Sequence, residues 1–137
     1  MDRLSKERRS WNMGRIRSTN TTPEIRVRSI LHRLGYRFRL HSKNLPGRPD
    51  IVLPKWHHAI FVHGCFWHRH SSCKFCYTPK SRTEFWSAKF KGTIERDKLA
   101  EGALRSLGWH VTLVWECELD DEDKLARKLG EAIQRTA

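Results

Sequence analysis

Cysteine and histidine side chains crowd into one short stretch of the chain. Cys65, Cys73 and Cys76 lie within twelve residues that also hold His68 and His70. The first residues of the chain lack the apolar stretch of a secretory signal, so we expect a reducing compartment, where disulfides are rare. Thiolate and imidazole groups are the ligands that Zn²⁺ prefers in proteins. The stretch therefore predicts a metal site rather than redox chemistry.

The spacing of these residues indicates a closed zinc site. Cys65, His70 and Cys73 are separated by four and by two residues, and Cys117 follows an expected strand and could supply a fourth ligand. Four protein ligands leave no position open for water, so such a zinc ion would be structural. Two alternatives remain: Cys73 and Cys76 form a Cys-x2-Cys pair that could compete for the ion, or the thiols are buried and bind nothing.

A carboxylate stands at the start of a short apolar segment, directly after the proline-containing loop 45–49. This residue is Asp50, and oxygen ligands of its kind are those that Mg²⁺ prefers. His63 ends the next apolar segment, and antiparallel pairing of the two segments would bring its imidazole close to Asp50. Alternatively, Asp50 is an ordinary turn residue and His63 is a structural residue at the end of a strand.

The elements that position these residues follow from the spacing of apolar side chains. A first helix is expected to begin with Thr22 as its N-cap, with Pro23 and Glu24 in its first turn, and to end at Gly35. A long helix is expected over 83–107, with Gly92 as a point where it could break. The expected strands are 36–40, 50–53, 59–63 and 109–115, and the last helix begins at Asp120 or Asp121.

This order of elements predicts an α/β fold. Three strands joined by short links should pair antiparallel, and the long helix should cross over and place the fourth strand parallel to a neighbour. The result is a mixed sheet flanked by helices. A length of 137 residues suits one domain. Residues 1–20 have too few apolar side chains to belong wholly to the core, so we expect them to form an arm or helix available to contact a partner, and residues 21–137 to form a single domain.

The charge of the chain indicates a polyanionic partner. The net charge is +12, and residues 1–55 hold 14 Lys and Arg against 4 Asp and Glu. Clustered positive charge favours nucleic acid, because bound phosphates release their condensed counterions. The alternative is a basic surface that only keeps the protein in solution. No apolar run exceeds four residues, which excludes a membrane-spanning helix.

Five separated motifs resemble those of the very short patch repair (Vsr) mismatch endonucleases. They are Phe61-Val62-His63-Gly64-Cys65-Phe66-Trp67-His68, Leu45-Pro46-Gly47-Arg48-Pro49-Asp50, Arg82-Thr83-Glu84-Phe85-Trp86, Glu95-Arg96-Asp97 and Val114-Trp115-Glu116-Cys117. The resemblance implies a fold like that of restriction endonucleases, with catalytic Mg²⁺ and structural Zn²⁺. It also implies a nick on the 5′ side of the thymine in T:G mismatches, which arise by deamination of 5-methylcytosine, and this nick would begin a short repair tract.

The same resemblance implies roles for individual residues. Asp50 is similar to the carboxylate that holds magnesium, with the backbone carbonyl of Val62 as a further ligand, and His68 is similar to the histidine that activates the attacking water. The family pattern matches the zinc ligands Cys65, His70, Cys73 and Cys117, and leaves Cys76 extra. Three more residues would hold metal-bound waters or orient a histidine: His63, Glu24 and Asp97.

The resemblance further implies how DNA is engaged. Phe66, Trp67 and Trp86 resemble residues that wedge into the base stack from the major groove, and Met13 resembles one that enters from the minor groove. Arg48 and Lys89 are candidate phosphate contacts. The alternative is that these aromatic rings belong to the core, as we expect for Trp109 and Trp115, and that the charges only face solvent.

Three functions compete at this point. The first is a Mg²⁺-dependent mismatch endonuclease; the second is a zinc-stabilised DNA-binding module without catalysis; the third is a restriction-like nuclease with broader targets. Asp50 and His68 favour an enzyme over a binding module. We expect a monomer that binds double-stranded DNA containing a mismatch and no membrane, in the bacterial cytoplasm and associated with the nucleoid. The sequence does not identify its repair partners.

Overall fold

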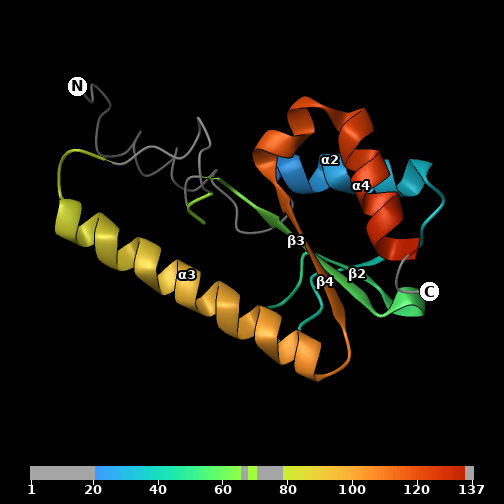
Figure 1. Cartoon of the computed structure of the whole chain (residues 1–137), viewed down its shortest axis with the longest axis horizontal. Coiled ribbons are helices and arrows are strands. Elements are labelled where there is room, and N and C mark those ends of the chain that lie inside the picture. The colour runs from blue at the N-terminus through green and yellow to red at the C-terminus, as the bar shows by residue number, and fades with distance from the viewer. Residues whose placement is uncertain (1–20, 66–67, 71–78, 135–137) are drawn as a thin grey trace, which may run out of the picture.

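The computed structural model of the chain describes residues 21–65, 68–70 and 79–134. Four strands form one sheet that helices cover on both faces (Figure 1). Among these residues, no helix is long and apolar enough to cross a membrane. The elements in chain order are α2 (Thr22–Arg33), β1 (Arg39–Leu40), β2 (Ile51–Leu53), η1 (Pro54–Trp56), β3 (His58–His63), α3 (Thr83–Ser106), β4 (His110–Trp115), η2 (Glu116–Asp120) and α4 (Glu122–Gln134).

The sheet has the mixed pairing that the sequence predicts. Its strand order is β1-β2-β3-β4, with the first two pairs antiparallel and the last pair parallel. The parallel pair is the longest, because its register runs through six partners from His58 opposite His110 to His63 opposite Trp115. The long helix α3 makes the crossover between β3 and β4. The ends of β3 and β4 therefore lie side by side, and the loops that follow them meet.

The first strand is shorter than expected. Only Arg39 and Leu40 pair with β2, which has three residues. Tyr36 and Phe38 instead pack against the core cluster, where the Tyr36 ring meets the edge of Trp56 at 5.9 Å between centroids. The expected strand over 36–40 is therefore wrong in its first half, because aromatic packing rather than strand pairing holds those residues.

The helix boundaries differ slightly from the predicted ones. The N-cap of α2 is Thr21 rather than Thr22, since the Thr21 hydroxyl accepts a hydrogen bond from the Glu24 amide at 3.4 Å. Helix α3 runs through Gly92 without a break over 24 residues. A single glycine costs a helix only about 1 kcal/mol, which the neighbouring turns can absorb. Asp121 caps α4, with its carboxylate accepting from the Lys124 amide at 3.1 Å.

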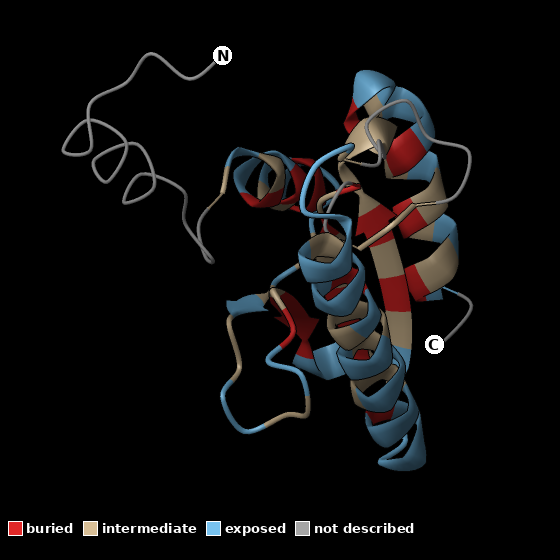
Figure 2. Ribbon diagram, turned by 90° about the vertical axis from the view of Figure 1, so that its left-hand side faces the viewer, coloured by how far each residue is buried: buried red, intermediate tan, exposed pale blue. Residues whose placement is uncertain are grey.

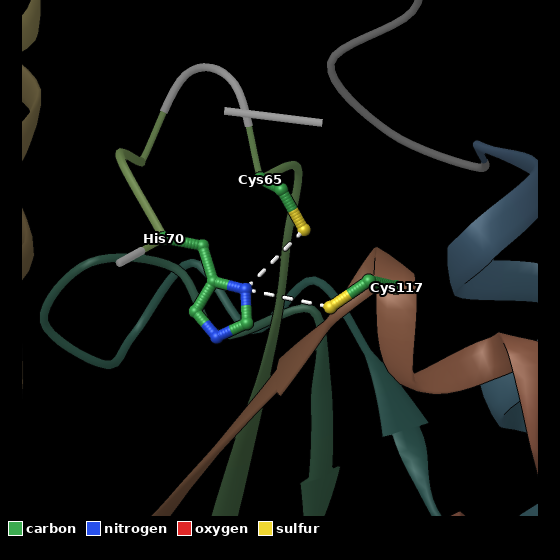
Figure 3. Close-up of side chains that lie close together, drawn as sticks. All are labelled: Cys65, His70 and Cys117. Carbon is green, nitrogen blue, oxygen red and sulfur yellow. Dashed lines mark hydrogen bonds between the residues drawn. The ribbon is translucent and has the colours of Figure 1, made fainter. Parts of the chain in front are cut away.

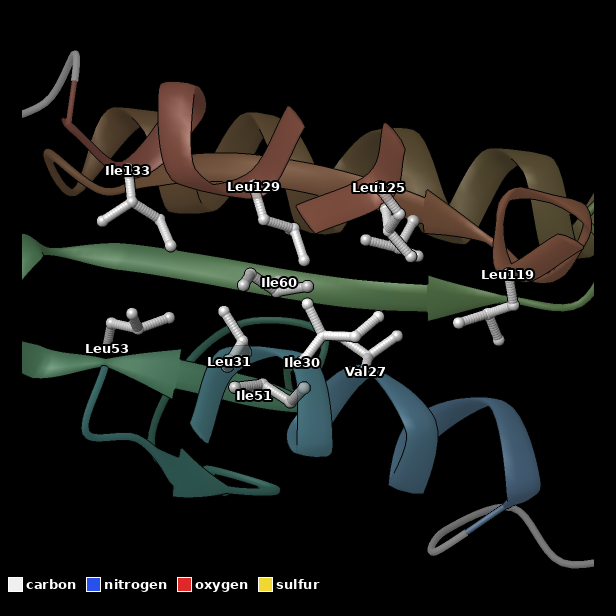
Figure 4. Packing of buried hydrophobic residues seen from close by; sticks show 11 residues of the cluster. Val27, Ile30, Leu31, Ile51, Leu53, Ile60, Leu119, Leu125, Leu129 and Ile133 are labelled. Carbon is white, nitrogen blue, oxygen red and sulfur yellow. The ribbon is translucent and has the colours of Figure 1, made fainter. Parts of the chain in front are cut away.

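The hydrophobic core lies between the sheet and the pair of helices α2 and α4. It combines Val27, Ile30 and Leu31 with Leu125, Leu129 and Ile133 across the strands (Figure 4). The two helices are each buried along one side, whereas α3 is exposed along most of its length (Figure 2). Helix α3 lies on the other side of β3 and β4 (Figure 1). The two faces of the sheet thus differ, with one carrying the core and the other facing a long helix that is mostly exposed.

Two tryptophans expected in the core are only half-buried. Trp109 stacks on His57 at 4.8 Å between ring centroids, and Trp115 stacks on His70 at 4.2 Å. Neither belongs to the core cluster. The expectation is therefore wrong for both, and Trp115 packs instead against a candidate metal ligand.

Candidate active site and metal centre

Three clusters of side chains could hold metal ions among the residues that the structure describes. In each cluster the possible ligand atoms lie within 4.8 Å of one another. The clusters are Glu24 with His41 and Asp50, His63 with His68 and Asp97, and Cys65 with His70 and Cys117. The first two contain every predicted catalytic residue, and the third contains three of the four predicted zinc ligands.

Asp50 is held against strand β3. Its Oδ2 accepts a hydrogen bond from the Val62 amide at 2.7 Å, a reach that follows from the antiparallel register of β2 and β3. Burial raises the pKa of Asp50 to about 6, the Val62 amide opposes this rise, and the nearby Glu24 carboxylate adds to it. A buried carboxylate beside a second one carries a charge that a divalent cation would stabilise. The donor set therefore fits Mg²⁺.

Two side chains, Arg28 and His41, hold Glu24 in this cluster. Glu24 is 3% exposed in the first turn of α2, and its Oε2 lies 3.2 Å from Arg28 Nη2 and 3.0 Å from His41 Nε2. Both His41 and Arg28 lower the pKa of Asp50, against the dominant effect of burial. The two side chains orient Glu24 toward Asp50 and offset part of the negative charge there.

His41 and Arg28 were missed in the sequence analysis, although the sequence carries a signal for both. Arg28 lies four residues after Glu24 in a helix, which places the two on one face. His41 follows β1, and its amide donates to the Asp50 carbonyl at 3.2 Å, so the hairpin register brings it beside Asp50. Once 39–40 is paired with 51–52, the third member of the cluster can be identified.

The second cluster lies at the end of β3 and joins it to α3. The imidazole rings of His63 and His68 stack with centroids 3.8 Å apart and planes 6° from parallel. His68 Nδ1 lies 2.6 Å from Asp97 Oδ2, and His63 Nε2 lies 4.0 Å from Asp97 Oδ1. Burial lowers the pKa of His63 to about 4, helped by the adjacent His68 and opposed by Asp97. His63 is therefore neutral near pH 7.

His63 groups with His68 and Asp97, whereas the sequence predicts that its imidazole lies close to Asp50. The His63 imidazole lies with His68 and Asp97, one residue along β3 from the amide that binds Asp50. The bond to Asp97 orients His68: when Nδ1–H donates to the carboxylate, Nε2 of the neutral ring carries a lone pair. His68 therefore has the geometry of a general base.

The third cluster lies where β3 and β4 end. His70 Nδ1 lies 3.7 Å from Cys65 Sγ and 3.4 Å from Cys117 Sγ (Figure 3). Ligand atoms of a tetrahedral zinc site are about 3.5–3.8 Å apart, given its usual bond lengths. Cys65 is buried, and its amide donates to Glu116 Oε1 at 3.2 Å. The three side chains therefore fit Zn²⁺, whereas Cys73 and Cys76 lie outside the described residues.

The loop between Gly64 and His70 directs its two histidines to different clusters. The His68 amide donates to the Gly64 carbonyl at 3.1 Å, and the His70 amide donates to the Cys65 carbonyl at 3.1 Å. Arg69, between the two histidines, has a φ of 57°, in the left-handed region. As predicted, His70 lies with the cysteines and His68 lies with the candidate catalytic residues.

The candidate DNA contacts lie partly on the exposed start of α3. Trp86 is half-buried and stacks on Phe90 at 5.8 Å, while Lys89 is exposed, with its Nζ 5.9 Å from the Phe85 ring. Arg48 is exposed in the loop before Asp50. These positions suit contact with a ligand. Met13, Phe66 and Trp67, and the expected arm over 1–20, lie outside the described residues.

Comparisons with known proteins identify the family of the chain. The family model of the DNA mismatch endonuclease Vsr matches residues 1–74. The chain is 53% identical over 128 residues to the type II nicking enzyme V.XorIIP of Xanthomonas oryzae pv. oryzae, which covers 93% of both chains. It is 44% identical over 120 residues to the DNA mismatch endonuclease Vsr of Escherichia coli K12, which covers 88% of this chain and 76% of the relative.

A solved structure shows the same fold. The catalytic domain of the homing endonuclease I-Bth0305I matches with a TM-score of 0.61 and 25% identity, over 85% of this chain and 98% of that one. The mixed four-stranded sheet flanked by helices is therefore an endonuclease architecture.

Proposed function

Because the chain belongs to the Vsr family of DNA mismatch endonucleases, we propose that it nicks one strand of double-stranded DNA on the 5′ side of the thymine in a T:G mismatch. The reaction would be a Mg²⁺-dependent hydrolysis of the phosphodiester bond that leaves a 5′-phosphate and a 3′-hydroxyl. The E. coli relative is named a mismatch endonuclease and the Xanthomonas relative a nicking enzyme, and we propose both properties for this chain. The nick would begin short-patch repair.

The proposal is supported by two groups of side chains along β3, one of carboxylates and one of imidazoles. Asp50 and Glu24 offer carboxylate oxygens beside the Val62 amide, and His63 and His68 follow at the end of the same strand. Hydrolysis of a phosphate diester uses ligands that bind a metal ion and, next to them, an imidazole oriented to take a proton. A module that only binds DNA needs neither group.

Asp50 and the backbone carbonyl of Val62 would hold Mg²⁺, with Glu24 and His63 positioning waters of the site. When bound, Mg²⁺ would polarise the scissile phosphate and stabilise the negative charge that develops on the leaving oxygen. His68 would take a proton at Nε2 from the attacking water, because Asp97 holds its Nδ1 at 2.6 Å. Asp97 would stabilise the imidazolium that forms.

The remaining roles concern structure and DNA contact. Zn²⁺ held by Cys65, His70 and Cys117, with Cys73 as the fourth ligand, would tie the end of β3 to the end of β4. Trp86, Phe66, Trp67 and Met13 would unstack the bases beside the mismatch, where a weakened pair makes unstacking least costly. Arg48 and Lys89 would contact phosphates.

The Asp50→Asn variant tests the catalytic role. The amide keeps the shape of the side chain and removes the charge that would bind Mg²⁺. In a nicking assay on a labelled T:G duplex, we expect activity with Mg²⁺, loss of activity in EDTA, and a loss of at least about 100-fold in the variant. The Asp123→Asn variant, at an exposed position on α4, is the control and should nick as the unmodified protein does. Nicking that persists in EDTA or in Asp50→Asn would reject the proposal.

A further inference from the structure

Three consecutive residues of the loop after β3 make three separate attachments. His68 binds Asp97 on α3 at 2.6 Å, and His70 lies between Cys65 and Cys117. Between them, the guanidinium of Arg69 lies over the ring of Phe90, with its Cζ 4.0 Å from the ring centroid. The family motif and the proposed mechanism assign nothing to Arg69.

Phe90 and Asp97 lie on one face of α3, and both contact the loop after β3. Asp97 is seven positions after Phe90, which is close to two helical turns and about 10 Å along the axis. Phe90 is 8% exposed, so its ring is a fixed surface. The loop is thus attached to the helix at two neighbouring points, Arg69 on Phe90 and His68 on Asp97.

The backbone at Arg69 needs such an attachment. Its φ of 57° is a conformation that residues with a side chain adopt rarely, and neighbouring contacts must hold it in place. This conformation is also what turns His68 and His70 toward different clusters. A flat guanidinium over an aromatic face is a favourable contact that suits arginine better than lysine.

We propose that Arg69 is a positioning residue for the hydrolysis: its stack on Phe90 holds His68 in hydrogen-bonding position on Asp97. The inference rests on the proposed role of His68 as general base. Arg69 would act through His68 and not on the reacting atoms themselves. The competing explanation is that Arg69 contacts a DNA phosphate and affects binding alone.

Two variants remove the stack from its two sides. Arg69→Gly removes the guanidinium while glycine tolerates the positive φ, and Phe90→Leu removes the ring while Arg69 stays in place. The readouts are the single-turnover nicking rate at saturating T:G duplex, the Kd for that duplex at several salt concentrations, and the zinc content. We expect each variant to lower the rate about 10-fold or more with zinc content unchanged, and Arg69→Gly to keep its Kd within about 3-fold. Phe90 also stacks on Trp86, so the Kd criterion applies to Arg69→Gly alone.

Two further variants serve as controls. Arg69→Lys keeps the cation and loses the flat guanidinium, so it should recover part of the rate. Arg105→Gln changes an exposed arginine on α3 that pairs with Glu101 and should leave the rate unchanged. In a chain that already carries Asp97→Asn, Arg69→Gly should add less than about 2-fold, because the two changes disturb one hydrogen bond.

A spectroscopic readout separates this inference from the proposed function. In protein with ¹⁵N-labelled histidine, the Nδ1–H signal of His68 is assigned by its loss in His68→Ala. We expect it to persist in Arg69→Lys and Arg105→Gln, and to weaken in Arg69→Gly and Phe90→Leu, whether or not DNA is cleaved. A signal that is unchanged in Phe90→Leu would overturn the inference, as would a raised Kd with a shallower salt dependence and an unchanged saturating rate in Arg69→Gly. Failure of the unmodified protein to nick T:G duplex would instead reject the proposed function.

Discussion

At the residue scale, the two histidines at positions 68 and 70 are separated by one residue in the sequence and lie in different clusters. We expect His70→Ala to lose most of its zinc and to have a lower melting temperature, because the substitution removes a proposed ligand of the zinc ion that Cys65 and Cys117 would also bind. We expect His68→Ala to keep zinc and stability and to lose at least about 100-fold in nicking rate, the usual effect of losing a general base.

Metal analysis of the two purified variants, together with thermal unfolding and the nicking assay, checks this division. Loss of zinc from His68→Ala would contradict it. So would a His70→Ala protein that retains both its zinc and its melting temperature.

The stability of the protein should also depend on pH through a histidine far from the zinc cluster. His58 is 2% exposed at the start of β3; its Nε2 lies 2.6 Å from the Thr112 hydroxyl, and its Nδ1 has no hydrogen-bond partner among the described residues. Burial lowers the pKa of His58 to about 4, and the nearby His110 and Arg105 act in the same direction. In the unfolded chain the ring takes up its proton near pH 6.5.

The unfolded state therefore binds more protons than the folded state between pH 6.5 and pH 4. The contribution of His58 to stability is complete above pH 6.5 and declines as the pH falls through this window. We expect His58→Gln to reduce the loss of unfolding free energy between pH 7 and pH 5 by up to about 2 kcal/mol. His63, whose pKa is also lowered to about 4, keeps part of the dependence.

Urea unfolding at a series of pH values measures this effect. His32→Gln, at an exposed position on α2, is the matched control and should leave the pH dependence unchanged. The same pH dependence in His58→Gln and in the unmodified protein would contradict the prediction.

The sequence specifies individual site residues well where chemistry and motif coincide. Asp50 and His70 can be identified from side-chain type and spacing, and His68 from its resemblance to the family motif; the structure places each in a cluster of ligand-bearing groups. His41 is harder to identify, because its importance depends on a two-residue strand pairing. Arg69 is harder to identify as well, since the contact with Phe90 depends on where the crossover helix lies.

At the element scale, the loop before Asp50 is set by a close approach to α3. Gly47 has a φ of 74°, and a Cβ at this position would collide with Ala100 and lie 3.3 Å from the Phe61 ring. We expect Gly47→Ala to destabilise the fold by roughly 2–4 kcal/mol, the sum of backbone strain and overpacking. Because Asp50 is three residues away, the nicking rate should fall as well.

Gly102→Ala is the matched comparison for Gly47→Ala. Gly102 lies within α3, and a Cβ there would have no neighbour within 4 Å. This variant should be more stable than the unmodified protein by about 0.5–1 kcal/mol, the difference in helix propensity. Urea unfolding measures both changes. A Gly47→Ala protein as stable as the unmodified one would show that the loop can move away from α3.

The sequence predicts the starts of the helices more accurately than the lengths of the short strands, and the reason is physical. The helices carry capping residues and apolar spacing that are local in sequence, so α2 and α4 begin within one residue of a predicted cap. The length of β1 depends on its partner, and β2 offers only three residues. Local signals therefore specify the helices, whereas pairing determines where the short strands begin and end.

At the scale of the whole molecule, the order and direction of the strands follow from short links and from a helix long enough to cross over. The convergence of the three clusters does not follow from these rules. It requires the register of β3 against β4, which places His63 opposite Trp115 and the two following loops together. The fold class was predictable from element order, but this meeting of side chains required the three-dimensional structure.

We propose that the protein hydrolyses mismatched DNA in preference to matched DNA. Single-turnover nicking with Mg²⁺ tests this preference on end-labelled duplexes that differ only at one base pair: T:G, A:C, T:A and C:G. We predict a single nick at the phosphate 5′ of the thymine in the T:G duplex, at a rate at least about 10-fold above that of either matched duplex. Equal nicking of the matched duplexes, or a nick at another phosphate, would contradict the claim.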